Sequence, residues 1–219
     1  MKLSIEGKPA FAYVNVVLEP GESITAESDA MASMEATLEM KAKLNGGMLK
    51  APIRKFLGGE SLFVNEFTNN TPLPCRLTLV QATPGDVMEK QLNNETYFMQ
   101  PGAYIASTPG VKIGIKWAGI SSWIGGEGLF KIVASGTGSV LFGAYGGLVE
   151  KHVEGEYIVD SSHLVAYDPQ MKLKTQMAGG IFSSLFGGEG LVTRISGTGK
   201  IVIQSRSLSG LSGWLNKYI

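Results

Sequence analysis

The sequence of 219 residues contains a single cysteine, Cys75, and only two histidines, His152 and His163. One cysteine excludes an intramolecular disulfide framework and any metal site built from several thiolates, and it is typical of a reducing compartment. It also excludes the zinc site of the nucleobase deaminases, which needs a cysteine pair beside the histidine. We expect Cys75 to be a small buried apolar residue and both histidines to lie in turns or at the surface.

Net charge and long apolar runs are absent too. Lysine and arginine together number 19, as do aspartate and glutamate, so the chain has no long-range basic field that would attract polyanions. Nucleic acid is therefore disfavoured as a partner. No window holds the roughly 18 uninterrupted apolar residues of a membrane span, and the first residues have no apolar core of signal-peptide length. The sequence predicts a soluble, cytoplasmic protein.

Glycine, by contrast, is abundant, with 29 residues, and it recurs in repeated phrases. The phrase GGEGL occurs at 125–129 and 187–191, and a near copy, GGESL, occurs at 58–62. Each is preceded by a second glycine-led phrase, and these lie at 21–24, 102–105 and 155–158. The same order of phrases in three places predicts internal duplication.

We interpret the chain as one compact domain of three repeats, 1–82, 83–145 and 146–205, followed by a C-terminal tail, 206–219. No linker rich in serine, proline or charge separates the repeats, which argues against independent modules.

Alternating apolar and polar residues between the two phrases predict one half-buried strand per repeat, in 34–44, 111–117 and 171–177. In the second and third repeats, S-G-T-G at 135–138 and 196–199 precedes a β-rich run, which predicts a hairpin turn. The predicted fold is all-β, with three internally duplicated units of the β-sandwich or double-stranded β-helix type about a pseudo-threefold axis.

The candidate ligand or metal site consists of the glutamates that share one position in the repeated phrase: Glu60, Glu127 and Glu189. If these carboxylates converge about the axis, they could hold a divalent cation, because hard ions prefer oxygen ligands. Alternatively, each carboxylate accepts hydrogen bonds from backbone N–H groups exposed in a Gly-Gly turn and serves only the scaffold. The sequence leaves both interpretations open.

Aromatic side chains supply the candidate partner contacts. Phe56, Trp123 and Phe186 lie in short apolar connectors, one before each copy of the repeated phrase. These connectors either pack in the core and between subunits or form an exposed apolar rim that contacts a protein or a membrane surface. Trp214 lies in the apolar tail, for which we expect docking on its own body or on a neighbouring subunit, with membrane contact as the alternative.

The phrases together resemble a known family. E-P-G-E at 19–22, both copies of GGEGL and both copies of S-G-T-G are similar to the bacterial members of the altered-inheritance-of-mitochondria protein 24 family. This family is also called domain of unknown function 124, and the resemblance covers essentially the whole chain. It implies repeated β units like the tryptophan RNA-binding attenuation protein, fused in threes and assembled into a homo-oligomeric ring. Eukaryotic relatives are associated with mitochondrial inner-membrane organisation, bacterial members have no established activity, and the family supplies no catalytic residues.

The predicted function is a non-enzymatic, oligomeric scaffold or binding protein, with a trimer favoured and with a protein or membrane surface as partner. The alternative is a small-ligand or divalent-metal-binding β protein that uses the repeated glutamates. We expect no cofactor, because S-G-T-G-K at 196–200 fails the phosphate-loop spacing at Arg194 and Ile201. RNA binding is disfavoured, because no lysine or arginine recurs at one position across all three repeats.

Overall fold

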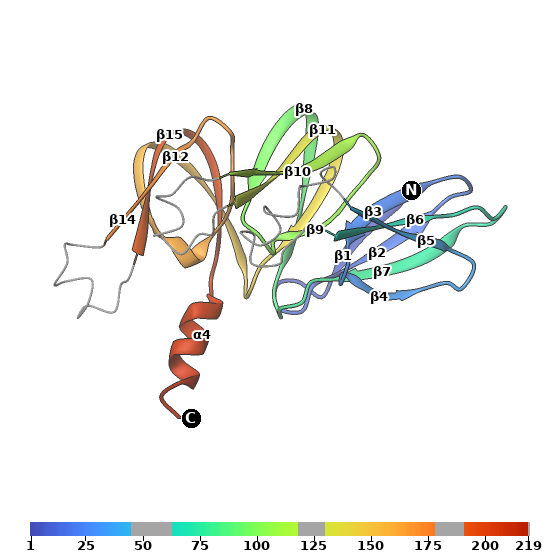
Figure 1. The fold of residues 1–219 in the computed structure, drawn as a ribbon, viewed down its shortest axis with the longest axis horizontal. Coiled ribbons are helices and arrows are strands. Elements are labelled where there is room, and N and C mark those ends of the chain that lie inside the picture. The colour runs from blue at the N-terminus through green and yellow to red at the C-terminus, as the bar shows by residue number, and fades with distance from the viewer. Residues whose placement is uncertain (45–62, 118–129, 178–190, 219) are drawn as a thin grey trace.

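Antiparallel strands make up most of the structure, a computed structural model that describes residues 1–44, 63–117, 130–177 and 191–218. Apart from one turn of 3-10 helix, the described part contains a single helix, α4 (Leu208–Leu215). The all-β prediction is confirmed. Figure 1 shows the strands in three groups side by side along the longest axis, with α4 leaving the last group.

The second and third groups have the same order of elements. Each begins and ends with a long strand, and two shorter strands lie between them in sequence. The second group consists of β8 (Val87–Met99), β9 (Tyr104–Ser107), β10 (Val111–Trp117) and β11 (Phe130–Gly143). The third consists of β12 (Leu148–Asp160), β13 (Leu164–Tyr167), β14 (Lys172–Met177) and β15 (Leu191–Gln204). In each group the two long strands pair with each other.

The first group follows the same order with its long strands interrupted. Its strands are β1 (Lys2–Glu6), β2 (Tyr13–Leu18), β3 (Ser23–Glu27), β4 (Met31–Met34), β5 (Glu39–Leu44), β6 (Phe63–Thr68) and β7 (Cys75–Val80). The turn at 19–22 separates β2 from β3, and the turn at 69–74 separates β6 from β7. These breaks let β2 and β7 leave the sheet that contains β3 and β6.

Two sheets result. The four-stranded sheet has the order β1-β2-β7-β4, and the eleven-stranded sheet runs β12-β15-β13-β8-β11-β9-β3-β6-β5, with β10 on β11 and β14 on β15. The groups are joined where β3 pairs with β9 and where β8 pairs with β13. No pairing between described strands joins the third group to the first.

The hairpin predicted at S-G-T-G is wrong, because both copies lie inside continuous long strands, β11 and β15. Gly136, Gly138 and Gly197 have positive φ angles of 120°, 139° and 125°. A register shift between Gly136 and Thr137 marks a β-bulge against β8. Positive-φ glycines and bulges bend a strand as well as reverse it, so the glycines here curve a strand that continues.

The strand predicted at 34–44 is also corrected. The structure ends β4 at Met34 and begins β5 at Glu39, and the two strands belong to different sheets. The backbone N–H of Glu35 donates to the carbonyl of Arg76, which fixes the intervening turn. Leu38 is buried as predicted, but Met40 is 45% exposed because β5 is an edge strand.

The glycine-led phrases do not share one place. The phrase at 21–24 follows β2 and enters β3, and the phrase at 155–158 lies within β12, opposite β15. The phrase at 102–105 comes later in its group, in the turn that leads into β9. Within β8 of the second group, the non-glycine residue Asn94 has a positive φ angle of 55°.

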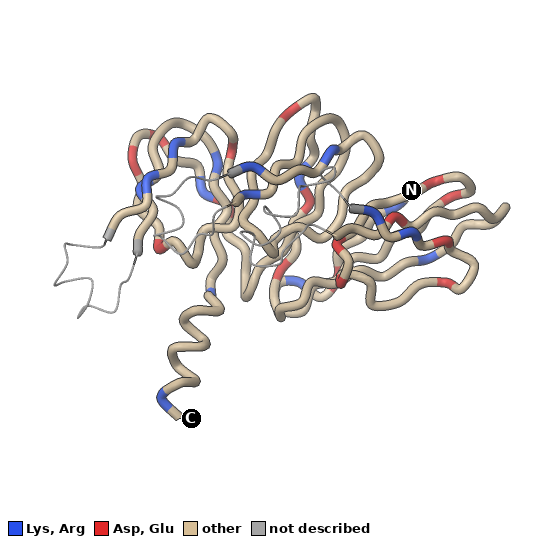
Figure 2. Tube along the Cα trace, in the orientation of Figure 1, with Lys and Arg blue, Asp and Glu red and all other residues tan. Residues whose placement is uncertain are grey.

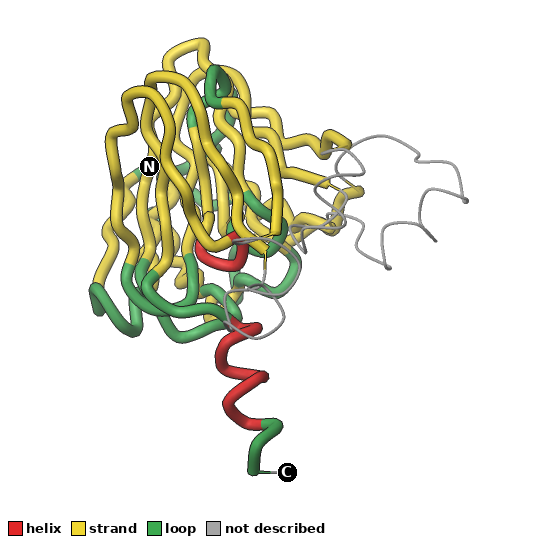
Figure 3. The backbone as a smooth tube through the Cα atoms, turned by 90° about the vertical axis from the view of Figure 1, so that its left-hand side faces the viewer, coloured by secondary structure: helices red, strands yellow, loops and turns green. Residues whose placement is uncertain are grey.

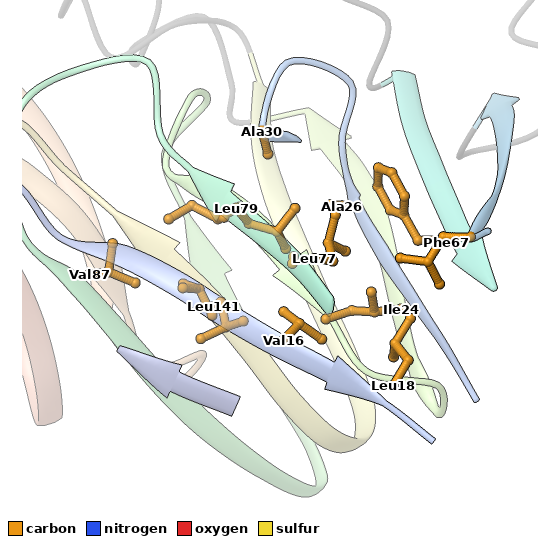
Figure 4. Close-up of a cluster of buried hydrophobic side chains, with 14 of the residues drawn as sticks. Val16, Leu18, Ile24, Ala26, Ala30, Phe67, Leu77, Leu79, Val87 and Leu141 are labelled. Carbon is orange, nitrogen blue, oxygen red and sulfur yellow. The ribbon is translucent and has the colours of Figure 1, made fainter. Parts of the chain in front are cut away.

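The hydrophobic core crosses the joints between groups. Figure 4 shows Val87 and Leu141 of the second group beside Val16 and Leu77 of the first. A second cluster contains Tyr97, Phe142 and Val202, and therefore joins the second group to the third. Buried apolar side chains are therefore packed across both joints between groups.

Candidate functional site

The predicted glutamates and three of the four predicted aromatic contacts lie outside the described residues. These are Glu60, Glu127, Glu189, Phe56, Trp123 and Phe186. Convergence of the carboxylates and exposure of the apolar rim therefore stay predictions. Among the described residues, no group of three or more His, Cys, Asp or Glu could hold a metal ion.

Trp214, the remaining predicted contact, lies on α4. The hydroxyl of Ser207 accepts a hydrogen bond from the backbone N–H of Gly210 at 3.1 Å, which caps the helix N-terminus. No residue of α4 is buried, and Figure 3 shows the helix projecting from the strands. The expectation that the tail docks on its own body is therefore wrong for this part of the chain.

The apolar side chains of the helix and its following turn gather on one face. Leu208, Leu211 and Leu215 recur at spacings of three and four residues, with Trp214 beside them. Ser209 lies on the opposite side, and Ser212 lies outside the apolar face at its border. Trp214 is 56% exposed, and its ring packs on that of Tyr218 with centroids 5.1 Å apart. The result is an apolar face on a helix none of whose residues is buried.

The charged side chains next to this helix in the sequence are basic. No aspartate or glutamate occurs after Glu189, whereas Arg206 and Lys217 flank α4 on its two sides. Figure 2 shows this as a tan helix with a basic position at either end and no acidic one. Among the described helices, none has the length and hydrophobicity needed to cross a membrane.

A second feature is a set of lysines on three corresponding strands. They are Lys41 and Lys43 on β5, Lys112 and Lys116 on β10, and Lys172 and Lys174 on β14. The lysines of β5 form ion pairs with Glu39 and Glu66 at 2.8 and 2.5 Å. For the lysines of β10 and β14, no ion pair with a described acid is found. Among the described residues, the lysines of β5 are therefore ion-paired and those of β10 and β14 are not.

Register shows how closely these lysines correspond. Lys112 lies opposite Ser135 and Lys172 lies opposite Ser196, so both occupy the same place relative to S-G-T-G. In the first group, Glu39 takes this position, opposite Thr68. The correspondence is closer than the sequence suggests, yet no position carries lysine in all three groups. A ring of identical basic contacts, as RNA-binding rings use, is not formed by these strands.

Lys131 lies at the joint between the second and third groups. Its ammonium is 3.8 Å from the centroid of the Phe98 ring and 5.5 Å from that of Tyr167, and these two rings are 5.4 Å apart. Burial lowers the pKa of Lys131, and the nearby charge of Lys116 lowers it further. Sequence analysis missed this cluster because its members come from β8, β10, β11 and β13, and no local pattern links them.

The chain is similar to known proteins over nearly its whole length. A profile of the family described as Mitochondrial biogenesis AIM24 matches residues 3–206. An uncharacterized protein of Streptococcus pyogenes serotype M6 is 27% identical over 228 residues, which cover 100% of this chain and 91% of the relative. The X-ray crystal structure of a Streptococcus pyogenes protein is similar with a TM-score of 0.80 and 27% sequence identity, covering 100% of this chain and 99% of that one.

Proposed function

This chain belongs to the Mitochondrial biogenesis AIM24 family, and on that premise we propose that it is a non-enzymatic, oligomeric scaffold that attaches to an anionic membrane surface. The observation that carries the proposal is α4: its apolar residues form one face, yet none of its residues is buried. Exposed apolar surface of this kind marks an interaction site, because water contact costs free energy that a partner removes.

A membrane surface fits this helix better than a protein groove for two reasons. Leucine and tryptophan on one face are the residues that enter the headgroup boundary, where an indole ring finds both apolar and polar neighbours. Arg206 and Lys217 come just before and just after α4 in the sequence, and each basic residue near an anionic surface contributes about 1 kcal/mol.

The oligomer supplies what one short helix lacks. An eight-residue helix buries little apolar area and binds weakly alone, but several copies on one rigid body bind together with much higher avidity. We propose a homo-oligomer, with a trimer as the predicted number, built from three repeats like the units of the tryptophan RNA-binding attenuation protein. The cytoplasmic location predicted from the sequence is part of this proposal.

Vesicle flotation tests the membrane contact. The full chain is mixed with vesicles of phosphatidylcholine alone or with added phosphatidylglycerol, and Trp214→Asp is compared with the matched control Ser212→Asp. Both substitutions add one negative charge to α4, but only Trp214 lies on the apolar face. We expect the wild type and Ser212→Asp to float with the anionic vesicles and Trp214→Asp to stay behind.

Thermal unfolding provides the folding control. Because no residue of α4 is buried, both variants are expected to unfold at the wild-type temperature. Equal flotation of a folded Trp214→Asp variant would overturn the membrane contact. A wild type that never floats but loses its oligomeric state with Trp214→Asp would assign the helix to a second copy of the chain.

A further inference from the structure

Two joints between strand groups use one register. At the first joint, Thr25 and Ala26 of β3 lie opposite Ser107 and Ala106 of β9. At the second, Phe98 and Met99 of β8 lie opposite Tyr167 and Ala166 of β13. Both joints are antiparallel and connect the end of the opening long strand of one group to the first short strand of the next.

The internal partners confirm that these positions correspond. Ser107 also lies opposite Val140 of β11, and Tyr167 lies opposite Ile201 of β15. Val140 and Ile201 each follow their S-G-T-G segment by the same interval. The same comparison places Met34 of β4 with them, because Met34 lies opposite Leu77 of β7 as the last residue of its short strand.

One edge at each end of the chain has no joint. β12 pairs only with β15, and β4 pairs only with β7, among the described strands. By register, Ile158 and Val159 of β12 correspond to Phe98 and Met99 of β8, since Ile158 lies opposite Arg194 as Phe98 lies opposite Val133. Figure 1 shows β12 and β4 at opposite ends of the molecule, so one chain cannot pair them with each other.

Burial shows what the two free edges lack. All residues of β9 and β13 are buried, whereas in β4 the two methionines are half-buried and the two residues between them are exposed. Tyr97 on β8 is 2% exposed, but Tyr157, its counterpart on β12, is 39% exposed. Ile158 beside it is 53% exposed. β12 and β4 thus lack the neighbouring strand that covers β8, β9 and β13 at the internal joints.

We infer that a second copy of this chain provides that cover, its β4 pairing antiparallel with β12 in the register of the internal joints. Ile158 then lies opposite the Met34 of the neighbouring copy, and Val159 lies opposite its Ser33. The pairing joins β14-β15-β12 of one copy to β4-β7-β2-β1 of the next, which completes the third sheet of the kind seen twice within the chain. It also removes two exposed strand edges, which are otherwise templates for aggregation.

The contact is head-to-tail, so each copy uses different surfaces at its two ends. Such contacts repeat from copy to copy and give a ring where the rotation between copies closes, or an open filament where it does not. The assembly is the oligomeric part of the function proposed above, but it uses no residue of α4. Failure of membrane binding and failure of assembly are therefore separable.

Disulfide cross-linking tests the register. Met34→Cys with Ile158→Cys places two cysteines opposite each other across the inferred contact. Met34→Cys with Val149→Cys is the matched control, because Val149 is also exposed on β12 but lies near its other end. The wild type controls for the buried Cys75. We expect linked multimers on a non-reducing gel for the first pair alone. No linkage in the first pair, or equal linkage in both, would overturn the inference.

Introduced charges test the contact without cross-linking. Ile158→Lys and Met34→Glu each place a charge at the inferred interface, and the double variant pairs them. By native mass spectrometry, we expect the wild type to be oligomeric, each single variant to lose the oligomer and the double variant to regain it. A monomeric wild type, or single variants that assemble fully, would overturn the inference. Loss of assembly with Trp214→Asp but not with Ile158→Lys would likewise overturn it and assign the contact to α4.

Discussion

The Lys131 ammonium sits over the Phe98 ring at 3.8 Å from its centroid, and no described carboxylate forms an ion pair with it. The lysine is half-buried, so its charge is partly removed from water, and Lys116 adds repulsion. The electron-rich ring face offsets part of this cost, by about 1 kcal/mol. The charge of Lys131 therefore adds little stability to this joint. Aromatic and aliphatic packing stabilises the joint instead.

Two substitutions separate charge from packing at this joint. Lys131→Met keeps the aliphatic stem and removes the charge, so we expect the free energy of unfolding to change by less than about 0.5 kcal/mol. Phe98→Ala removes a half-buried ring that packs on the core cluster of the third group, and should cost about 2–3 kcal/mol. Urea unfolding measures both. A Lys131→Met variant as unstable as Phe98→Ala would show that the ammonium has a strong partner.

Gly85 lies in the segment that connects β7 to β8, and we expect this position to tolerate no side chain. A Cβ atom there would lie 1.8 Å from the carbonyl oxygen of Ala144, and Gly85 forms an isolated parallel bridge with Gly146. Gly85→Ala should therefore cost about 3 kcal/mol or more, because two backbone segments must separate. Gly102→Ala is the control: its φ angle is 80° but the space around it is open, so the cost should be about 1–2 kcal/mol. Similar unfolding midpoints for the two variants would contradict this.

Asn69 is expected to hold the turn that interrupts the closing strand of the first group. The side chain is buried, and its Nδ2 donates to the carbonyls of Leu18 and Leu73, both at 2.8 Å. Asn69→Ala removes both of these hydrogen bonds from a buried site and should lower the free energy of unfolding by about 2–3 kcal/mol. Asn70→Ala, at the exposed neighbouring position, should cost less than about 1 kcal/mol. Equal losses in chemical denaturation would argue against this role.

The parts of the fold that sequence predicted are those decided locally. In β10, Ile113 is buried and Lys112 and Lys116 are exposed, as the alternation predicts. Burial on one face of a strand leaves this pattern in any window of a few residues. A contact of Trp214 with a partner stays a prediction, made because an apolar tail is visible in the sequence.

The parts of the fold that the sequence predicted wrongly depend on strands that are distant in the sequence. Glycine at positive φ occurs both in hairpin turns and in bulges, so S-G-T-G alone does not say whether the chain reverses. The chain continues here because β8 pairs with β11 on both sides of Gly136. Similarly, the sequence does not reveal that Tyr157 lies at a free edge while Tyr97 is covered, because the covering strand comes from another group.

The last prediction concerns acid stability and the turn at 19–22. The carboxylate of Glu22 forms an ion pair with the N-terminal ammonium of Met1, and its Oε2 accepts from the backbone N–H of Glu19 at 2.8 Å. These two interactions, the first being the larger, lower the pKa of Glu22. A lowered folded-state pKa adds stability above the unfolded-state value, about 4.3 for glutamate, and this stability is lost as the pH falls through the folded-state pKa.

Glu22→Gln isolates this contribution. At neutral pH the variant should be less stable than the wild type by about 0.5–1 kcal/mol, a small value because the side chain is 35% exposed and the pair is screened by water. The difference should shrink as the pH falls below 4 and vanish once Glu22 is protonated in the folded wild type. Urea unfolding of both proteins across this range measures it. A difference that stays constant with pH would mean that glutamine loses only packing or hydrogen bonds, and that the charge of Glu22 does not stabilise the turn.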